Sequence, residues 1–266
     1  MKMYVDGTTI SKSIQSYFKL QTKLQTMNMQ LTQTMQQLKL NGMRQAYESL
    51  SETRQVDQLS ACELLNLLLQ AEYEERHNKK LITLTKAAHF RYQASIEEIT
   101  FPVKRNLSKD TFLRLADCSF IDRNENILIT GATGVGKSFL ASAIGHQACS
   151  KGYKACYFNT QKLFTKLAMA KADGSYVKEM NRIARKDLLI LDDFGLQTLN
   201  AEKRMELLEI IEDRHGKRST VLCSQLPVTK WYDVIEDSTI ADAILDRLIN
   251  GSHRLELKGE SLRKKS

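Results

Sequence analysis

A glycine-rich stretch that ends in lysine and serine has the residue types and spacing of a phosphate-binding loop. Residues 131–138 read Gly-Ala-Thr-Gly-Val-Gly-Lys-Ser and match the pattern G-x-x-x-x-G-K-[ST] at each fixed position. Glycines let the backbone fold closely around phosphate oxygens, so that successive N–H groups point at the anion. The lysine of this pattern reaches the β- and γ-phosphates, and the serine hydroxyl holds Mg²⁺. The residues predicted to bind a nucleoside triphosphate are Gly131, Ala132, Thr133, Gly134, Val135, Gly136, Lys137, Ser138 and Phe139.

Two carboxylates that follow an apolar run provide the second part of such a site. Residues 188–191 are Leu-Leu-Ile-Leu, and Asp192 and Asp193 come directly after them. At the carboxyl edge of a parallel sheet, Asp192 would hold Mg²⁺ through water together with Ser138. Asp193 would orient or deprotonate the attacking water. Because Asp also ends strands at turns, the pair is informative chiefly in company with the phosphate loop.

Further polar residues fit a hydrolase, in addition to Lys137. Ser224 or Gln225, at the end of a later predicted strand, could contact the γ-phosphate or its attacking water, and ordinary strand-end polarity is the other interpretation. Arg247 lies on a predicted helix and could enter a neighbouring subunit's site as an arginine finger, which is worth roughly 10³–10⁵ in rate. From spacing alone, a surface charge is the simpler interpretation of Arg247.

The elements that must position these residues follow from the hydrophobic pattern. Helical patterns alternate with short β-branched or apolar runs that predict buried strands. This alternation predicts a parallel sheet with helices on both faces, which is a three-layer α/β fold. The predicted strands cover residues 126–130, 153–158, 188–191, 220–225 and 253–257. The predicted helices between them cover residues 139–150, 161–186 with a break at 174–175, and 201–215.

The chain before the sheet is mostly helical in pattern. Apolar residues recur at helical spacing from Leu31 onward, and Ser60 with Glu63 forms a capping-box signature that begins a leucine-rich helix. Residues 1–28 are polar and read as a flexible or weakly helical leader. We therefore expect a leader at 1–28, a small all-helical domain for DNA or partner binding at 29–115, and an ATPase domain at 116–266.

Composition limits the class of protein. The 266 residues are 42% hydrophobic and carry a net charge of +8, which is ordinary for a soluble protein and permits a polyanionic partner. The sequence has no apolar run long enough for a membrane span and no secretory h-region, so we expect a cytoplasmic protein. Its five scattered cysteines are best explained as free thiols in a reducing compartment.

The order of several spaced motifs resembles that of the IstB-like transposition helper ATPases, which are AAA+ proteins close to the DnaC/DnaI helicase loaders. The resemblance extends from about residue 31 to residue 265. Its landmarks are residues 126–138, 187–195, 224–227 with Trp231, 242–248 and 257–263, together with 75–76 and 86–90 in the helical part. The resemblance implies an ATP- and Mg²⁺-dependent helper that forms a ring or spiral homo-oligomer on duplex DNA, selects the target and stimulates its cognate transposase.

The resemblance also implies roles for single residues. It makes Arg247 the arginine finger, Ser224 or Gln225 the first sensor, and Arg263 a second, nucleotide-sensing basic group. Two departures from the AAA+ pattern bear on these roles. Asp193 stands where many AAA+ proteins carry Glu, which predicts slow hydrolysis. The sequence also ends where most AAA+ proteins continue into a helical lid, which affects the assignment of Arg263.

In initiator-type AAA+ proteins the helices after the second strand line the nucleic-acid channel. The matching segment here is basic, and the predicted DNA-contacting residues are Lys162, Lys166, Lys171, Lys178 and Arg182. A solvated helix face is the other interpretation of these charges. The main alternative function is a helicase loader that binds a replicative helicase through its N-terminal helices. A small-molecule kinase lacks an acceptor-site signal, and a GTPase lacks an N-K-x-D motif after Asp192.

Overall fold

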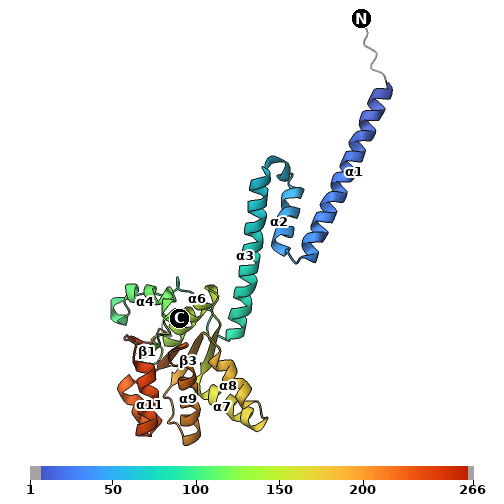
Figure 1. Cartoon of the computed structure of the whole chain (residues 1–266). Helices are drawn as coiled ribbons and strands as arrows, with labels where there is room; N and C mark the ends of the chain where they lie inside the picture. Colours follow the sequence, from blue (N-terminus) through green and yellow to red (C-terminus); the bar gives the residue numbers. More distant parts are fainter. Residues whose placement is uncertain (1–6, 263–266) are drawn as a thin grey trace. The chain divides into compact units, whose positions relative to one another are not determined.

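The computed structural model describes residues 7–262, apart from the side chains of residues 7–18, 20, 21, 24 and 103. The chain divides into two compact units, Met1–Lys80 and Leu81–Ser266, each of which is described by itself (Figure 1). The boundary lies earlier in the chain than the predicted division at 115/116. Residues 81–115 contribute to the core of the second unit, where Ile99, Leu107 and Phe112 are buried in one cluster with residues of the sheet.

The first unit is helical. Its helices are α1 (Gly7–Gln37), α2 (Asn41–Glu52), the 3₁₀ turn η1 (Val56–Gln58) and α3 (Ala61–Ala88), which continues across the boundary. A small core of Met35, Tyr47 and Leu68 holds them together. The predicted capping box forms, since the Ser60 N–H donates to Glu63 Oε2 at 2.8 Å. Residues 7–28 of the predicted leader are part of α1, and residues 1–6 lie outside the described residues.

A buried carboxylate joins α2 to α3. The Gly42 and Met43 N–H groups at the start of α2 donate to Glu72 Oε2 at 2.8 and 3.2 Å. The helices approach so closely here that a Cβ on Gly42 would lie 2.4 Å from the Ala71 carbonyl oxygen. Glu72 thus supplies the N-terminal cap that α2 lacks in its own sequence. Its negative charge also interacts favourably with the positive end of the helix dipole.

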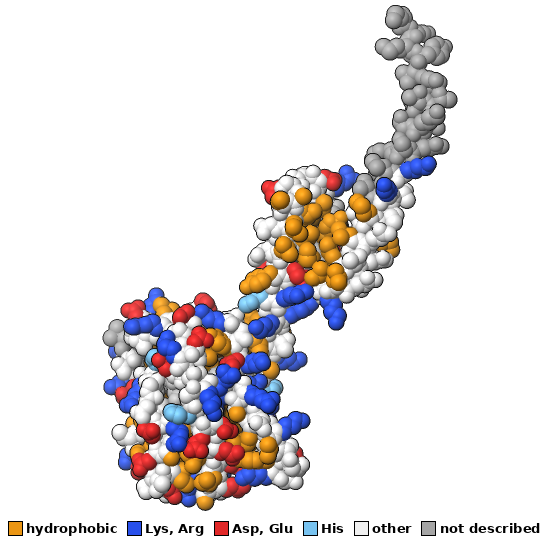
Figure 2. Space-filling view, viewed as in Figure 1, with side chains coloured by type: hydrophobic (Ala, Val, Ile, Leu, Met, Phe, Trp, Pro, Cys, Tyr) orange, Lys and Arg blue, Asp and Glu red, His pale blue; other side chains and the backbone are white. Residues whose placement is uncertain are grey.

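The first unit leaves large hydrophobic side chains uncovered. Figure 2 shows hydrophobic side chains gathered on one face of this unit. The exposed large hydrophobic residues of α3 and of the loop before α2 include Leu38, Leu65, Leu67, Leu69 and Tyr73. Single exposed apolar side chains are normal on a protein surface, whereas apolar side chains gathered on one face are typical of a protein–protein contact surface.

The second unit is built on a parallel sheet, as the sequence predicts. Its strands are β1 (Ile127–Gly131), β2 (Ala155–Asn159), β3 (Leu188–Phe194), β4 (Ser219–Ser224) and β5 (His253–Leu257). They pair in the order β2-β3-β4-β1-β5, and each pairing is parallel. The strand residues are buried on both faces, which explains their nearly continuous apolar sequence.

Helices cover both faces of this sheet. They are α4 (Lys109–Ala116), α5 (Ser119–Asp122), α6 (Lys137–Ser150), α7 (Thr160–Ala172), α8 (Tyr176–Ala184), α9 (Ala201–Arg214), α10 (Trp231–Ile235) and α11 (Ser238–Ile249), with the 3₁₀ turns η2 (Val103–Arg105) and η3 (Val228–Lys230). Ile127 and Ile129 face a core shared with α4 and α6, whereas Leu128 between them faces the core shared with α7–α11. Alternation along the strands therefore separates two hydrophobic layers. Among the described residues, none of the helices is both long and apolar enough to cross a membrane.

Candidate functional site

The loop between β1 and α6 adopts the backbone conformation that its glycines allow. Gly131, Gly134 and Gly136 have φ values of 144°, 85° and 92°. The strand pairing also leaves no space beside the first glycine, because a Cβ on Gly131 would lie 2.3 Å from the Leu257 carbonyl oxygen of β5. The loop residues and the start of α6 thus turn at the carboxyl edge of the sheet, where parallel α/β proteins bind ligands.

A pocket of about 410 Å³ lies over this loop. Its lining combines the phosphate loop with residues from β3, β4 and two more distant segments. The lining residues are Arg91, Tyr92, Thr133, Gly134, Gly136, Lys137, Ser138, Phe139, Asp193, Leu196, Gln225 and Leu262. The structure therefore brings Lys137, Ser138, Phe139, Asp193 and Gln225 around one space.

Lys137 is 6% exposed, and its ammonium group donates to the Gly131 and Ala132 carbonyl oxygens at 2.7 and 2.9 Å. These contacts hold the amine inside the loop that would surround a triphosphate. A buried ammonium beside inward-pointing N–H groups makes this loop a strongly anion-binding position.

Asp192 is fully buried and is not among the residues that line the pocket, although it directly precedes Asp193, which does line it. Its Oδ2 accepts hydrogen bonds from the Tyr157 hydroxyl and, at 3.3 Å, from Arg91 Nη1, while its Oδ1 accepts from the Asp193 N–H at 2.9 Å. Burial and the neighbouring Asp192 charge raise the pKa of the Tyr157 hydroxyl, so the phenol keeps its proton and remains a donor.

Asp193 is held from two sides. Its backbone has φ 59°, a left-handed conformation at the end of β3 that turns the side chain toward the pocket edge. Its Oδ2 accepts from Arg91 Nη1 at 3.0 Å and from Asn159 Nδ2 at 2.9 Å. Asn159 also caps α7, since its Oδ1 accepts from the Lys162 N–H at 3.3 Å. One asparagine therefore connects the candidate catalytic carboxylate to the first turn of α7.

The structure separates the two residues that the sequence left as alternatives. The Ser224 hydroxyl is buried, donates to the Phe194 carbonyl oxygen at 2.8 Å and accepts from the Leu226 N–H at 3.1 Å, so its contacts are all made within the fold. Gln225 instead lines the pocket, where its Oε1 accepts from the Thr133 hydroxyl at 2.6 Å. A contact from Ser224 to a γ-phosphate is not supported by this geometry, because adjacent residues at a strand end point in different directions.

Arg247 lies away from this pocket. Its guanidinium pairs with Glu212 of α9 at 2.9 Å and donates to the Ala243 carbonyl oxygen at 2.7 Å. Its own carbonyl oxygen accepts from Asn126, which directly precedes β1, so Arg247 lies toward the amino edge of the sheet. Arg247 does not line the nucleotide pocket of its own chain. An arginine that acts on a neighbouring subunit is expected to lie away from its own pocket. Arg263 lies outside the described residues.

The predicted DNA-contacting residues fall into two groups. Lys162, Lys166 and Arg182 line a second pocket of about 510 Å³, which also contains Arg91 and Asp193. Lys166 and Arg182 both pair with Glu179, at 2.8 and 2.5 Å, and each lies 5.6 Å from the centre of the Phe158 ring.

The other two residues do not line this pocket. Lys171 pairs with Glu202 and Glu206 of α9, both at 2.7 Å, and Lys178 is exposed on α8. We name the second pocket the basic groove. Its cations are Arg91, Lys162, Lys166 and Arg182.

Three residues of the site were not predicted from the sequence. Asn159 follows the predicted strand at 153–158 and pairs in register with Asp192, so a polar residue at this strand end was the available signal. Tyr157 is recognisable only once its strand is known to lie beside β3. Arg91 had no local signal, since it comes from an irregular segment before the sheet and is remote in sequence from the carboxylates that it contacts.

The donor set fits a magnesium ion. Ser138 and Asp193 line the pocket, and the buried Asp192 carboxylate lies next to Asp193, whose N–H donates to its Oδ1. Within residues 7–262 no group of three or more His, Cys, Asp or Glu side chains forms an all-protein metal site. Mg²⁺ is commonly held by one or two carboxylates together with substrate phosphates, so the residues present suit this ion.

Comparison with known proteins identifies the family. The profile described as IstB-like ATP binding protein matches residues 33–266. The chain belongs to this IstB-like family. Its relatives include the putative insertion sequence ATP-binding protein y4pL of Sinorhizobium fredii, which is 44% identical over 85% of this chain and 92% of that protein. The insertion sequence IS1162 putative ATP-binding protein of Pseudomonas fluorescens is 43% identical over 72% of this chain and 83% of its own length.

Solved structures show the same fold. The DnaC helicase loader has a TM-score of 0.55 at 21% identity and covers 63% of this IstB-like chain and 98% of its own. The replication initiator DnaA bound to AMPPCP and single-stranded DNA has a TM-score of 0.55 at 18% identity, over 65% and 52% of the two chains. The predicted fold class is confirmed. The IstB-like chain is an ATPase with a P-loop AAA+ fold.

Proposed function

We propose that this IstB-like protein is an ATP-dependent, DNA-binding helper of transposition. It assembles as a ring or spiral homo-oligomer on duplex DNA, selects the target and stimulates its cognate transposase. The relatives named as insertion sequence ATP-binding proteins support the transposition role. The observation that carries the proposal is that Asn159 joins the acidic side of the nucleotide pocket to the basic groove. Through this contact, DNA in the groove can act on ATP hydrolysis.

The chemistry assigned to the nucleotide pocket follows from the positions of its side chains. Lys137 exchanges its two carbonyl partners for phosphate oxygens. Ser138 and Asp192 would hold Mg²⁺, which when bound would supply positive charge to offset that of the phosphates. Asp193 orients the attacking water or accepts its proton, with Asn159 fixing the carboxylate. Gln225 borders the γ-phosphate side of the pocket, next to Thr133. Since Asp193 is one methylene shorter than Glu, we expect slow hydrolysis.

The basic groove suits a phosphate backbone. Two lysines and two arginines line it, and positively charged side chains of this kind contact phosphate oxygens of nucleic acids. Contacts of this kind are insensitive to sequence and weaken with salt, by about 0.9 in log K for each phosphate neutralised per unit of log salt. A helper that accepts many targets needs this behaviour. Lys171 is assigned instead to the packing of α7 against α9.

Reversing charge in the basic groove tests DNA binding. We expect the double variant Lys162→Glu/Lys166→Glu to bind duplex DNA at least about ten-fold more weakly and to lose DNA-stimulated ATP turnover, because about two phosphate contacts become repulsive. Lys217→Glu, at an exposed lysine after α9, is the matched control and should behave as wild type. Sedimentation with and without ATP and duplex DNA measures assembly. Equal weakening by both changes would indicate general electrostatics and would contradict a specific groove.

Arg247→Ala tests the contact between subunits. We expect ATP turnover under assembly conditions to fall by at least about a hundred-fold, because an arginine finger stabilises charge in the transition state. Nucleotide affinity of the unassembled protein should stay within about two-fold, since Arg247 is remote from its own pocket. Glu212→Ala, which only releases Arg247, should retain turnover. Normal turnover by Arg247→Ala on DNA would remove the finger assignment.

A helicase loader is the second candidate, and the likeness of the fold to that of the DnaC helicase loader is the observation that favours it. Leu65, Leu69 and Tyr73 of α3, which are spaced four residues apart and exposed, are available for a partner of either kind. Pull-down with the cognate transposase and with the host replicative helicase distinguishes the two functions. Retention of helicase alone would replace the transposition proposal.

The five cysteines are unpaired thiols, which suits the proposed action in a reducing cytoplasm.

A further inference from the structure

One cation touches both carboxylates of the nucleotide site. A single terminal nitrogen, Arg91 Nη1, lies 3.3 Å from Asp192 Oδ2 and 3.0 Å from Asp193 Oδ2. Asp192 is fully buried, and a buried carboxylate requires a counter-charge or several hydrogen bonds. Arg91 provides that counter-charge from within the chain. One of its two partners is Asp192, the carboxylate that is assigned to Mg²⁺.

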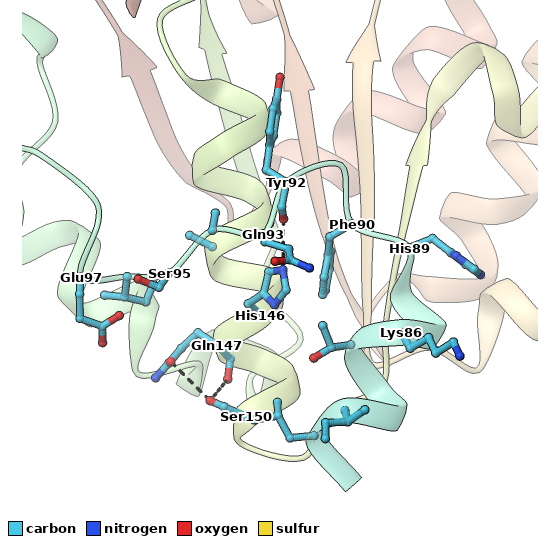
Figure 3. A pocket seen from close by; sticks show the side chains of 16 residues that line it. Lys86, His89, Phe90, Tyr92, Gln93, Ser95, Glu97, His146, Gln147 and Ser150 are labelled. Carbon is cyan, nitrogen blue, oxygen red and sulfur yellow. Dashed lines mark hydrogen bonds between the residues drawn. The ribbon is translucent and has the colours of Figure 1, made fainter. Parts of the chain in front are cut away.

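The backbone around Arg91 is anchored to α6, the helix that begins with Lys137. Phe90 packs against His146 with ring centres 4.5 Å apart, and the absence of a side chain at Gly145 makes room for it, since a Cβ there would lie 2.3 Å from the Phe90 ring. The His146 ring also meets the Tyr92 carbonyl oxygen at 3.1 Å. Figure 3 shows Phe90 beside His146 at the edge of a cavity of about 700 Å³. Both neighbours of Arg91 in the sequence are therefore held in place.

The Arg91 side chain nevertheless has room to turn. It is 39% exposed, and it borders both the nucleotide pocket and the basic groove. Rotation about its side-chain bonds can move the guanidinium away from the carboxylates without moving Phe90 or Tyr92. An arginine with an anchored backbone and a partly exposed side chain is suited to reversible contact.

We propose that Arg91 competes with Mg²⁺ for Asp192, so that the guanidinium must leave the acidic pair before the metal–nucleotide complex is held. Arg91 is thus a positioning residue for the ATPase site. It neutralises the pair in one arrangement and releases it in the other. The inference depends on the nucleotide site alone and does not require DNA or a transposase.

The test is the Mg²⁺ dependence of nucleotide binding. A fluorescent, non-hydrolysable ATP analogue is titrated with wild type and with Arg91→Gln at increasing Mg²⁺, and in EDTA. We expect Arg91→Gln to reach half-saturation at about three- to ten-fold lower Mg²⁺, as loss of a partly exposed ion pair implies, with affinity in EDTA unchanged. Arg91→Lys, which keeps the charge, should lie between wild type and Arg91→Gln.

Two comparisons make the result decisive. Lys86→Gln removes an exposed charge at the end of α3, away from the carboxylates, and should leave the Mg²⁺ requirement unchanged. Thermal unfolding checks that each variant is folded, and if Arg91→Gln unfolds, the same titration with Arg91→Lys decides. An unchanged or higher Mg²⁺ requirement in Arg91→Gln would overturn the proposal. Weaker binding in EDTA would also overturn it, since Arg91 would then be a phosphate ligand.

Discussion

Lys137→Ala is expected to lower ATP turnover by at least about a hundred-fold and to abolish ATP-dependent assembly on DNA. The ammonium lies inside the phosphate loop, 2.7 Å from the Gly131 carbonyl oxygen. Its removal takes away the charge that meets the β- and γ-phosphates, which no other described lysine lining the pocket can replace. Turnover is measured with and without duplex DNA, and assembly is measured by sedimentation of the same samples.

A matched control lies at the opposite end of the same helix, α6. Lys151 follows α6 and pairs with Asp117 at 3.2 Å in an exposed position. Lys151→Ala removes an equal charge and should retain turnover and assembly. If Lys137→Ala still formed the same particles on DNA with ATP, triphosphate binding would not be the cause of assembly, and the proposed function would need a different basis.

The largest expected effect on stability comes from Arg214, the last residue of α9. It is 1% exposed, and its guanidinium donates to the Ile183, Lys186 and Ser219 carbonyl oxygens and to the Thr220 hydroxyl. Burial lowers the pKa of Arg214 to about 10, because the loss of water around the guanidinium disfavours its charged form.

Arg214→Ala should lower the free energy of unfolding by about 3–5 kcal/mol, because it leaves several buried acceptors without a donor and opens a cavity. Chemical denaturation monitored by circular dichroism measures this change. Arg218→Ala is the comparison, since Arg218 is 45% exposed and lies 3.5 Å from Asp187, and it should cost less than about 1 kcal/mol. Similar costs for the two variants would show that the buried network contributes little.

Local sequence determined the parts of the protein that need only near neighbours. The phosphate loop is contiguous, so its glycines, Lys137 and Ser138 carry their conformation and chemistry within a few residues. The capping box at Ser60 is local in the same way. The alternation of apolar strands and helices likewise predicted the parallel sheet, because strands buried on both faces and amphipathic helices differ in period.

Tertiary structure decided which remote residues join the site. Arg91 and Tyr157 meet Asp192 only because two segments far apart in the sequence pack beside β3. The choice between Ser224 and Gln225 depended on which way each side chain points at the end of β4. The boundary between the units lies at Lys80/Leu81 and not at the predicted position 115/116, because residues in the range 81–115 are part of the core beside the sheet. Sequence patterns report periodicity and local turns, whereas contacts between distant segments exist only after the sheet has brought them together.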